Sequence, residues 1–402
     1  MNRHQRFWSF TRNTFCRGLE AFYRIELEPG ADPVPEPPFV VVSNHGTFFD
    51  PWILGRFQRR ALHIMMNDDG FRTGPATRWY LGGIGAFPKK KGAQDLRAMK
   101  RTLSFLRGGE PVLIFPEGQA TWDGETQPIY GGVERMVARA GCPLVIVRLR
   151  GNFLSRPWWA ESHRRGRISV SRRVIPAARI AEMKPAEILE EIQRGIFHND
   201  IRDAANRRER FAGSDLAVGV ERLVWRCMAC GAIDRLDTAG DVIACGACGR
   251  RWEVDAHLRV RGLDGAPAPH EDLYGWFRAD VARARDAARD AAREAGDEVL
   301  VANAARLELV GPRGRFVRQS AGVLELTARE LRYRPESAYR PAFRLPRERI
   351  EGYVIQQKDV LEVTASGVDH RFEMRGASPM KWLVSLRYLD GWEAVEKTRV
   401  IR

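Results

Sequence analysis

Short apolar runs alternate with amphipathic stretches over the first half of the chain. Residues 39–42, 112–115 and 143–147 are continuous runs of β-branched and other apolar residues, the pattern of strands that are buried on both faces. Residues 95–106 and 134–140 repeat apolar side chains at helical spacing. Strands that alternate with helices predict an α/β fold with a mostly parallel sheet flanked by helices.

From residue 299 onward the pattern changes to short strands. The strand candidates are residues 299–301, 322–326, 330–333, 352–355, 360–363 and 370–374. An amphipathic helix follows over residues 379–389. Repeated short strands closed by one helix resemble the pleckstrin-homology-like barrel in architecture, without a diagnostic motif. Such barrels often bind phosphoinositides or proteins, but a fold alone does not give a function.

The chain begins with a predicted amphipathic helix over residues 5–24. An aromatic face backed by arginines is typical of a helix that lies on anionic lipid, but the same face can equally pack on the chain's own core. Residues 154–173, in which two tryptophans are followed by five arginines, allow the same two interpretations, and there we favour membrane contact. The apolar face of the first helix holds Phe7, Trp8, Phe15, Leu19 and Phe22.

Composition and charge narrow the class of protein. The chain has 402 residues, 44% hydrophobic and 29% charged, which fits a folded protein of two or three domains. The net charge of +14 indicates an anionic partner, namely a phospholipid surface, a phosphorylated substrate or nucleic acid. No apolar run approaches the ~18–20 residues of a membrane span, and the start lacks a signal peptide's apolar core. We expect a cytoplasmic protein that associates peripherally with the inner face of the membrane.

Four of the six cysteines form two CxxCG knuckles. Cys227 and Cys230 make the first, and Cys245 and Cys248 make the second. Four thiolates at this separation predict a zinc ribbon with a closed tetrahedral site, and paired knuckles fit metal binding better than disulfides. The zinc is therefore expected to be structural. Nearby Trp and Arg residues allow contact with nucleic acid but do not require it.

A histidine and an aspartate stand in a predicted strand-to-helix turn. His45 follows the run 39–42, and Asp50 comes five residues later, just before Pro51 and an apolar helical start. Parallel sheets place their chemistry at such turns. A positioned histidine can take a proton from a hydroxyl, and a carboxylate can orient its ring. The alternative is that Asp50 only caps the helix and His45 is a polar turn residue.

A second block shifts the balance towards chemistry. The run 112–115 ends in Pro116, Glu117 and Gly118, and a glycine-containing turn at 85–88 leads into Lys89, Lys90 and Lys91. With His45 and Asp50 and the apolar block at 142–147, these motifs resemble the glycerolipid acyltransferases, the 1-acyl-glycerol-3-phosphate acyltransferase family. The resemblance covers roughly residues 20–210.

The resemblance implies an activity and a set of site residues. The expected reaction moves a fatty acyl group from a thioester, acyl-CoA or acyl-carrier protein, to a glycerolipid hydroxyl in phospholipid synthesis. The expected acceptor is the lysophospholipid 1-acyl-glycerol-3-phosphate. His45 and Asp50 are the implied catalytic residues. The implied substrate-binding residues are Asn44, Lys91, Glu117 and Gly118, with Lys91 neutralising the acceptor's phosphate.

The chain also departs from the family pattern. The family's usual arginine after the glycine-rich turn is a lysine here, which lacks the bidentate fork of arginine. The family often continues Thr-Arg-Ser after Phe-Pro-Glu-Gly, where this chain has Gln119, Ala120 and Thr121. These departures put the identity of the acceptor in doubt. The competing hypothesis is an inactive adaptor with this fold that docks on lipid or nucleic acid through the ribbon and the β domain; of the two anions, we do not expect nucleic acid.

These patterns divide the chain into four predicted segments. Residues 1–215 form the acyltransferase domain with its N-terminal helix, and residues 222–256 form the zinc ribbon. Residues 270–296, rich in Ala, Arg and Asp, form a charged helical linker that is largely solvated, either a spacer or a helix packed along one edge only. Residues 297–402 form the pleckstrin-homology-like β-rich domain.

Overall fold

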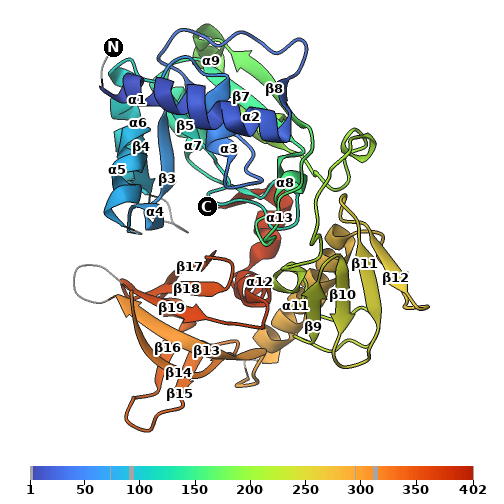
Figure 1. Ribbon diagram of the computed structural model, residues 1–402. Helices are drawn as coiled ribbons and strands as arrows, with labels where there is room; N and C mark the ends of the chain where they lie inside the picture. The colour runs from blue at the N-terminus through green and yellow to red at the C-terminus, as the bar shows by residue number, and fades with distance from the viewer. Residues whose placement is uncertain (1–2, 73, 90–94, 295, 311–315, 402) are drawn as a thin grey trace. The chain divides into compact units, whose positions relative to one another are not determined.

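The chain forms two compact units (Figure 1). The computed structural model describes residues 3–72, 74–89, 95–294, 296–310 and 316–401. The first unit comprises residues 1–158, 163–213 and 399–402, and the second comprises residues 159–162 and 214–398. The first therefore holds the α/β region, and the second holds both the four-cysteine segment and the β-rich region.

The first unit is built on a mostly parallel sheet of seven strands in the order β1-β8-β7-β2-β5-β3-β4. Every neighbouring pair is parallel except β7 and β8, and Val40 lies opposite both Val112 and Leu144. This arrangement confirms the predicted α/β fold class. The strands are β1 (Ile25–Leu27), β2 (Val40–Ser43), β3 (His63–Asn67), β4 (Ala86–Lys89), β5 (Val112–Ile114), β7 (Leu144–Arg150) and β8 (Ile168–Ile175).

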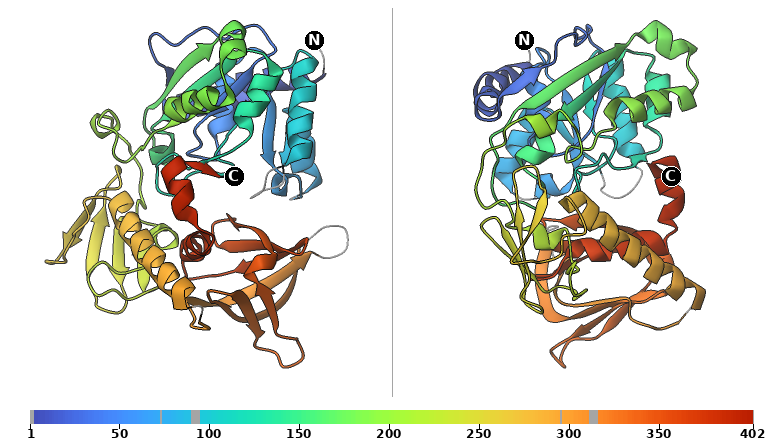
Figure 2. Two further views of the ribbon diagram at one scale, coloured as in Figure 1. Left: turned by 180° about the vertical axis from the view of Figure 1, so that it is seen from behind. Right: turned by 90° about the vertical axis from the view of Figure 1, so that its right-hand side faces the viewer.

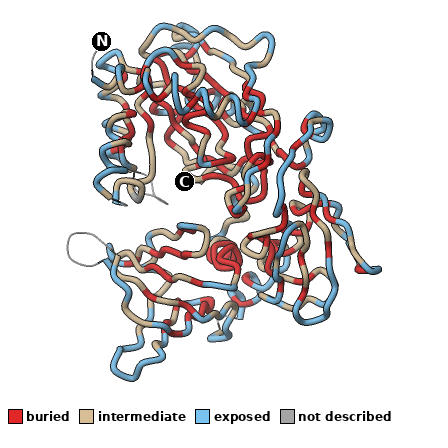
Figure 3. The backbone as a smooth tube through the Cα atoms, viewed as in Figure 1, coloured by how far each residue is buried: buried red, intermediate tan, exposed pale blue. Residues whose placement is uncertain are grey.

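Helices cover both faces of this sheet (Figure 2). Because strand residues alternate between the faces, Val41 and Val145 pack on the side of α1–α3, while Val42 and Ile146 pack on the side of α6, α7 and α10. The buried residues of this unit concentrate along the parallel strands (Figure 3). The helices are α1 (Arg3–Thr11), α2 (Arg17–Tyr23), α3 (Asp50–Arg56), α4 (Asp69–Arg72), α5 (Pro75–Gly83), α6 (Leu96–Arg107), α7 (Val133–Ala140), α8 (Asn152–Ser155), α9 (Ala177–Glu182) and α10 (Pro185–Ile196).

The predicted N-terminal helix is divided, and its two sides differ. A π-helical turn, Arg12–Cys16, separates α1 from α2. Trp8 is buried and donates its indole N–H to the carbonyl of Gln58 at 3.2 Å, and Tyr23 is buried as well. Phe10, Phe15 and Phe22 are exposed. The helix thus packs on the core along one side and leaves other aromatic side chains on the surface.

The arginine-rich segment after Trp158 packs into the fold. Arg164 is fully buried, Arg167 pairs with Glu26 and Glu209, and Arg173 pairs with Glu191. These contacts support the packing interpretation of this segment, and the membrane contact that we favoured from its sequence stays a prediction.

A short strand from the far end of the sequence belongs to the first unit. β20 (Val400–Ile401) pairs in parallel with β6 (Ile129–Tyr130). Arg399 lies 3.2 Å from Glu125 and also donates to the carbonyl of Thr126. No sequence pattern predicted this pairing.

The second unit begins with a four-stranded antiparallel sheet and a long helix. The strand order is β12-β11-β10-β9. Helix α11 (Leu273–Glu294) packs along α12 (Pro379–Leu389) and buries Trp276, Phe277 and Val281 on one edge. The strands are β9 (Leu236–Ala239), β10 (Val242–Cys245), β11 (Arg251–Val254) and β12 (Val260–Leu263).

The β-rich region forms a seven-stranded antiparallel sheet in the order β16-β15-β14-β13-β19-β18-β17. Each of the six predicted strands overlaps an observed one, β16 was not predicted, and α12 has the predicted bounds. The strands are β13 (Val301–Val310), β14 (Phe316–Leu326), β15 (Glu330–Pro335), β16 (Phe343–Pro346), β17 (Ile350–Gln356), β18 (Val360–Ala365) and β19 (Val368–Glu373), followed after α12 by α13 (Trp392–Thr398). Short 3-10 turns occur at Asn206–Arg208, Val220–Arg222 and Arg347–Arg349.

Candidate active site

His45 and Asp50 contact each other at the carboxyl end of β2. The Nδ1 atom of His45 lies 2.8 Å from Oδ2 of Asp50. This contact holds the neutral ring in the tautomer that carries its proton on Nδ1, so Nε2 is left as the basic atom. Within the described part of the chain, Nε2 has no hydrogen-bond partner, and the side chain is 17% exposed. A hydroxyl can therefore reach the basic nitrogen.

Four hydrogen bonds fix the fully buried carboxylate of Asp50. Besides His45, Oδ2 accepts from the backbone N–H groups of Gly46 at 2.7 Å and Thr47 at 3.0 Å. Oδ1 accepts from the side-chain amide of Asn152 at 2.9 Å. The helix begins at Asp50 itself, so its carboxylate closes the preceding turn and does not act as the N-cap that its position before Pro51 had suggested.

The segment after β5 holds the main chain of His45. Oε1 of Glu117 accepts from the His45 N–H at 2.6 Å, and Oε2 accepts from the Gln127 N–H at 2.5 Å. The N–H of Thr121 donates to the His45 carbonyl at 2.8 Å. Burial raises the pKa of Glu117 well above its usual range, against the lowering effect of the two N–H donors. Glu117 therefore fixes the main chain of His45. Its substrate-binding role stays a prediction.

The other predicted substrate-binding residues lie in different surroundings. Asn44 is buried and exchanges two hydrogen bonds with the main chain of Leu149, at 2.8 and 2.7 Å, which ties the end of β2 to β7. Gly118 has a φ of +75°, and a Cβ atom there would lie 2.6 Å from the ring of Tyr130. Lys91 lies outside the described residues. The substrate-binding roles of these three residues also stay predictions.

A largely apolar pocket of about 50 Å³ lies beside the His45–Asp50 pair, called the dyad below. Phe115 connects the two, because it lines the pocket and its ring stacks on His45 with 4.3 Å between centroids. Lys89 also lines the pocket, and its Nζ lies 4.5 Å from the centre of the Tyr130 ring. The other lining residues are Met65, Asp95, Ala98, Met99, Thr102, Ile114, Pro116, Gly131, Val133 and Met136.

The four cysteines of the second unit form one cluster. Their sulfur atoms all lie within 4.8 Å of one another, and the pairs Cys227–Cys248 and Cys230–Cys245 are each 3.8 Å apart. Sulfurs about 2.3 Å from a tetrahedral zinc ion would be separated by about 3.8 Å, so the donor set fits this metal. The spacing of the two knuckles predicted this cluster correctly.

Sequence reasoning missed Asn152 and Thr121 as parts of the site. Both are buried polar residues outside the motif blocks, and both contact the dyad through hydrogen bonds. A usable signal exists for Asn152, because it lies two residues after β7, and β7 pairs with β2, the strand that ends two residues before His45. Polar residues at the carboxyl ends of adjacent parallel strands converge on one edge of a sheet.

The N-terminal part of the chain matches a known protein family. Residues 16–150 match the family model described as Acyltransferase. The N-terminal part of the chain is an acyltransferase domain. Its recognition from four motif blocks is therefore confirmed. No helix in the described part of the chain is long and apolar enough to cross a membrane.

Three curated relatives resemble the acyltransferase domain. The chloroplastic 1-acyl-sn-glycerol-3-phosphate acyltransferases of Brassica napus and Arabidopsis thaliana are 27% and 28% identical over 144 residues, which cover 35% of this chain and 41% and 40% of theirs. One from Chlamydomonas reinhardtii is 27% identical over 159 residues, covering 39% of this chain and 47% of its own. The chain thus spans less than half the length of these relatives.

Two solved structures show more distant likenesses. A 1-acyl-sn-glycerophosphate acyltransferase from Thermotoga maritima is 18% identical with a TM-score of 0.38, and the match covers 46% of this chain and 80% of that one. The N-terminal PH domain of the human ARAP2 protein is 15% identical with a TM-score of 0.18, and the match covers 23% of this chain and 81% of that one.

Proposed function

We propose that the chain transfers a fatty acyl group from an acyl thioester to the hydroxyl of a glycerolipid, with 1-acyl-glycerol-3-phosphate as the expected acceptor. The observation that carries the proposal is the His45–Asp50 pair, whose accessible Nε2 atom lies beside a largely apolar pocket in an acyltransferase domain. The three curated relatives are named as acyltransferases of this lysophospholipid, and their names support the choice of acceptor.

The chemistry follows from the orientation of the His45 ring. Nε2 takes the proton of the acceptor hydroxyl as its oxygen attacks the thioester carbonyl, and the Asp50 carboxylate stabilises the imidazolium that forms. When the tetrahedral intermediate collapses, the carbon–sulfur bond breaks and the thiolate takes the proton back from Nε2. The products are the acylated lipid and the free thiol of the donor. No residue of the chain needs to carry the acyl group.

The pocket suggests where the substrates lie. Its methionine and aromatic walls suit a short part of an acyl chain, because methionine packs adaptably around flexible apolar groups. Lys89 at this wall offers positive charge to the phosphate of the acceptor, and the family resemblance assigns the same role to Lys91. We expect Gly118 to let the Tyr130 ring close this wall of the pocket, because a Cβ atom at Gly118 would lie 2.6 Å from that ring.

The distribution of charge favours a lipid surface as the anionic partner of the first unit. This unit carries 36 Lys and Arg against 21 Asp and Glu, whereas the second carries 29 against 30. The exposed Phe15 contacts Phe49 and Trp52 beside the dyad, and Phe10 and Phe22 are exposed on the same N-terminal segment. Aromatic and basic side chains together are typical of membrane interfaces. The near-neutral charge of the second unit argues against nucleic acid binding by the ribbon.

An acyl-transfer assay on the purified chain tests the proposal. Acyl-CoA and acyl-carrier protein are offered as donors. The acceptor 1-acyl-glycerol-3-phosphate is compared with glycerol 3-phosphate and with a lysophospholipid whose phosphate is esterified to a headgroup. We expect transfer to 1-acyl-glycerol-3-phosphate, with kcat lowered roughly 10²–10⁴-fold in His45→Ala while the melting temperature is kept. Undiminished turnover in His45→Ala refutes the mechanism. If no donor and acceptor pair reacts while the protein still binds lipid, the inactive adaptor replaces the enzyme.

A further inference from the structure

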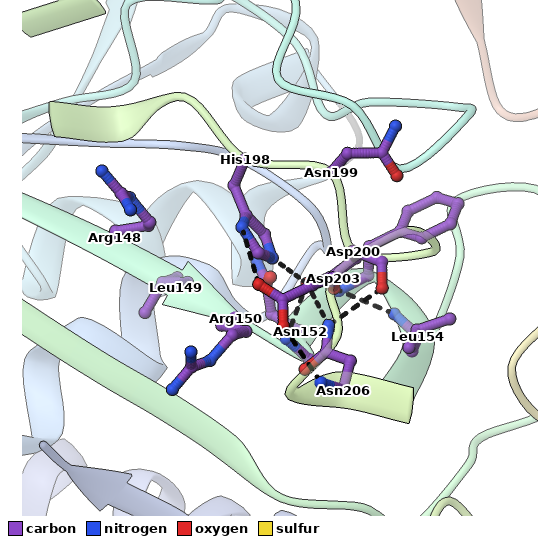
Figure 4. Close-up of polar contacts among 12 residues, drawn as sticks. Arg148, Leu149, Arg150, Asn152, Leu154, His198, Asn199, Asp200, Asp203 and Asn206 are labelled. Atoms are coloured by element: carbon purple, nitrogen blue, oxygen red, sulfur yellow. Dashed lines mark hydrogen bonds and ion pairs between the residues drawn. The ribbon is translucent and has the colours of Figure 1, made fainter. Parts of the chain in front are cut away.

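A second buried histidine–aspartate pair lies behind the dyad. The side chain of Asp200 is fully buried, and its carboxylate accepts from the N–H groups of Gly151 at 2.7 Å, Phe153 at 2.8 Å and Leu154 at 3.3 Å (Figure 4). These are the residues that surround Asn152 at the start of α8. The carboxylate thus fixes the backbone of the turn that carries Asn152.

The other side of Asp200 is equally occupied. Nε2 of His198 lies 2.8 Å from Oδ1, and the side-chain amide of Asn206 donates to the same oxygen at 2.9 Å. On its far side, Nδ1 of the His198 ring lies 3.6 Å from Asp203 (Figure 4). Burial alone would raise the pKa of Asp200, but the hydrogen bonds from His198, Gly151 and Asn206 hold it below its usual value. Asp200 is therefore an anion at neutral pH.

The turn that carries Asn152 is tightly packed on both sides. Gly151 has a φ of +82°, and a Cβ atom there would lie 2.3 Å from the carbonyl oxygen of Arg167. On the opposite side, a Cβ atom at Gly46 would lie 2.6 Å from Nδ2 of Asn152. The Asn152 amide therefore has little freedom, and it points at Oδ1 of Asp50.

We propose that Asn152 is a positioning residue for the His45–Asp50 pair, and that Asp200 with His198 holds Asn152 in place. The proposal deepens the function proposed above and rests on it. Asn152 is the one described partner of Oδ1 of Asp50, so it fixes the rotation of the carboxylate that aligns the His45 ring. Without that donor, a buried oxygen loses its partner and the carboxylate can turn away from Nδ1. A displacement of about 1 Å at a reacting group can cost 10²-fold in rate.

The test compares two buried residues of α8 in the full-length chain. Asn152→Ala removes the donor to Asp50, whereas Ser155→Ala removes a hydroxyl that donates to the carbonyl of Gly151 at 2.8 Å. Both changes create a small cavity in the same helix. We expect kcat to fall roughly 10²-fold in Asn152→Ala with KM little changed, and to stay within about twofold in Ser155→Ala.

A second measurement does not depend on activity. The hydrogen bond between Nδ1 of His45 and Asp50 is followed by the low-field NMR signal of the Nδ1–H proton in the unaltered chain, in Ser155→Ala and in Asn152→Ala. Because Asn152 fixes the carboxylate that accepts from Nδ1, we expect this signal to weaken or be lost in Asn152→Ala. Ser155→Ala should leave it unchanged.

The outcomes separate the two proposals. If Asn152→Ala and Ser155→Ala lower kcat and the melting temperature alike, and the Nδ1–H signal of His45 is kept in Asn152→Ala, Asn152 has only a packing role and the inference is wrong. If that signal is lost as expected but no acyl transfer is found in any assay, the positioning role holds and the proposed function fails.

Discussion

Val400 lies opposite Ile129 in a parallel pair of short strands, although the two residues are far apart in the sequence. The pairing gives the N–H groups of Ile129 and Gly131 their partners, the carbonyls of Arg399 at 3.0 Å and Ile401 at 2.9 Å. The strand between them carries Tyr130, which covers Gly118 and lines the pocket. A segment distant in sequence thus supports the wall of the candidate active site.

Ending the chain after Thr398 should therefore weaken the acyltransferase domain. We expect a lower melting temperature and a raised KM for the acyl donor, because the N–H groups of Ile129 and Gly131 lose their partners, at roughly 0.5–1.5 kcal/mol each, and the pocket wall loosens. Calorimetry and steady-state kinetics measure the two effects. Lys397→Ala, an exposed change just before the strand, is the control. An unaltered melting temperature and KM in the shortened chain would contradict the supporting role.

Replacing Glu117 should change how stability depends on pH. Its pKa is raised in the folded state, so its contribution is fully present below its unfolded value near 4.5 and is lost as pH rises towards the folded value. Glu117→Gln cannot ionise, and one oxygen still accepts an N–H. As the pH rises above about 4.5, we expect the free energy of unfolding of the unaltered chain to fall relative to that of the variant. Urea unfolding at several pH values measures this difference.

Glu117→Ala serves as the comparison for that variant. It leaves the N–H groups of His45 and Gln127 without their acceptor, so it should be less stable than Glu117→Gln at every pH. A constant offset between Glu117→Gln and the unaltered chain at all pH values would show that Glu117 is ionised in the folded protein.

Zinc should support the second unit and take no part in acyl transfer. Metal analysis is expected to find about one zinc per chain, because four thiolates form a closed site without an open coordination position. Cys227→Ser should lose the metal together with local order around the two knuckles. Hydrogen exchange of the backbone amides there measures the loss of order. Acyl transfer should persist after a chelator removes the metal. Activity that disappears with the zinc and returns with it would overturn the structural assignment.

Vesicle binding should depend on anionic lipid and on salt. Each basic residue near the surface is worth about 1 kcal/mol, and this attraction is screened over roughly 8–10 Å at ordinary salt. Binding should weaken with salt without vanishing, because inserted aromatic side chains are insensitive to it. Phe10→Ser with Phe15→Ser should reduce the salt-resistant part while the buried Trp8 keeps α1 in place. If nucleic acid strips the protein from anionic vesicles at physiological salt, the membrane proposal fails.

The sequence by itself determined the two clusters of side chains that depend on local spacing, namely the dyad and the four cysteines. His45 and Asp50 are five residues apart, so one turn brings them together, and the two knuckles fix four sulfurs in the same way. Continuous apolar runs identified the parallel strands, because side chains buried on both faces leave that pattern wherever the strand lies.

The tertiary structure alone decided which distant residues complete the site. Asn152 reaches Asp50, Thr121 reaches His45, and Val400 pairs with Ile129 only because strands and loops from separate segments meet. A single buried polar residue has no periodicity to reveal it, and its partner depends on strand order. The N-terminal helix shows the same limit: its pattern gave an aromatic face, but only packing decided that Trp8 is buried and Phe10 is exposed. Hydrophobic patterning reports that a residue can be buried, whereas the contacts of a buried polar group depend on the whole fold.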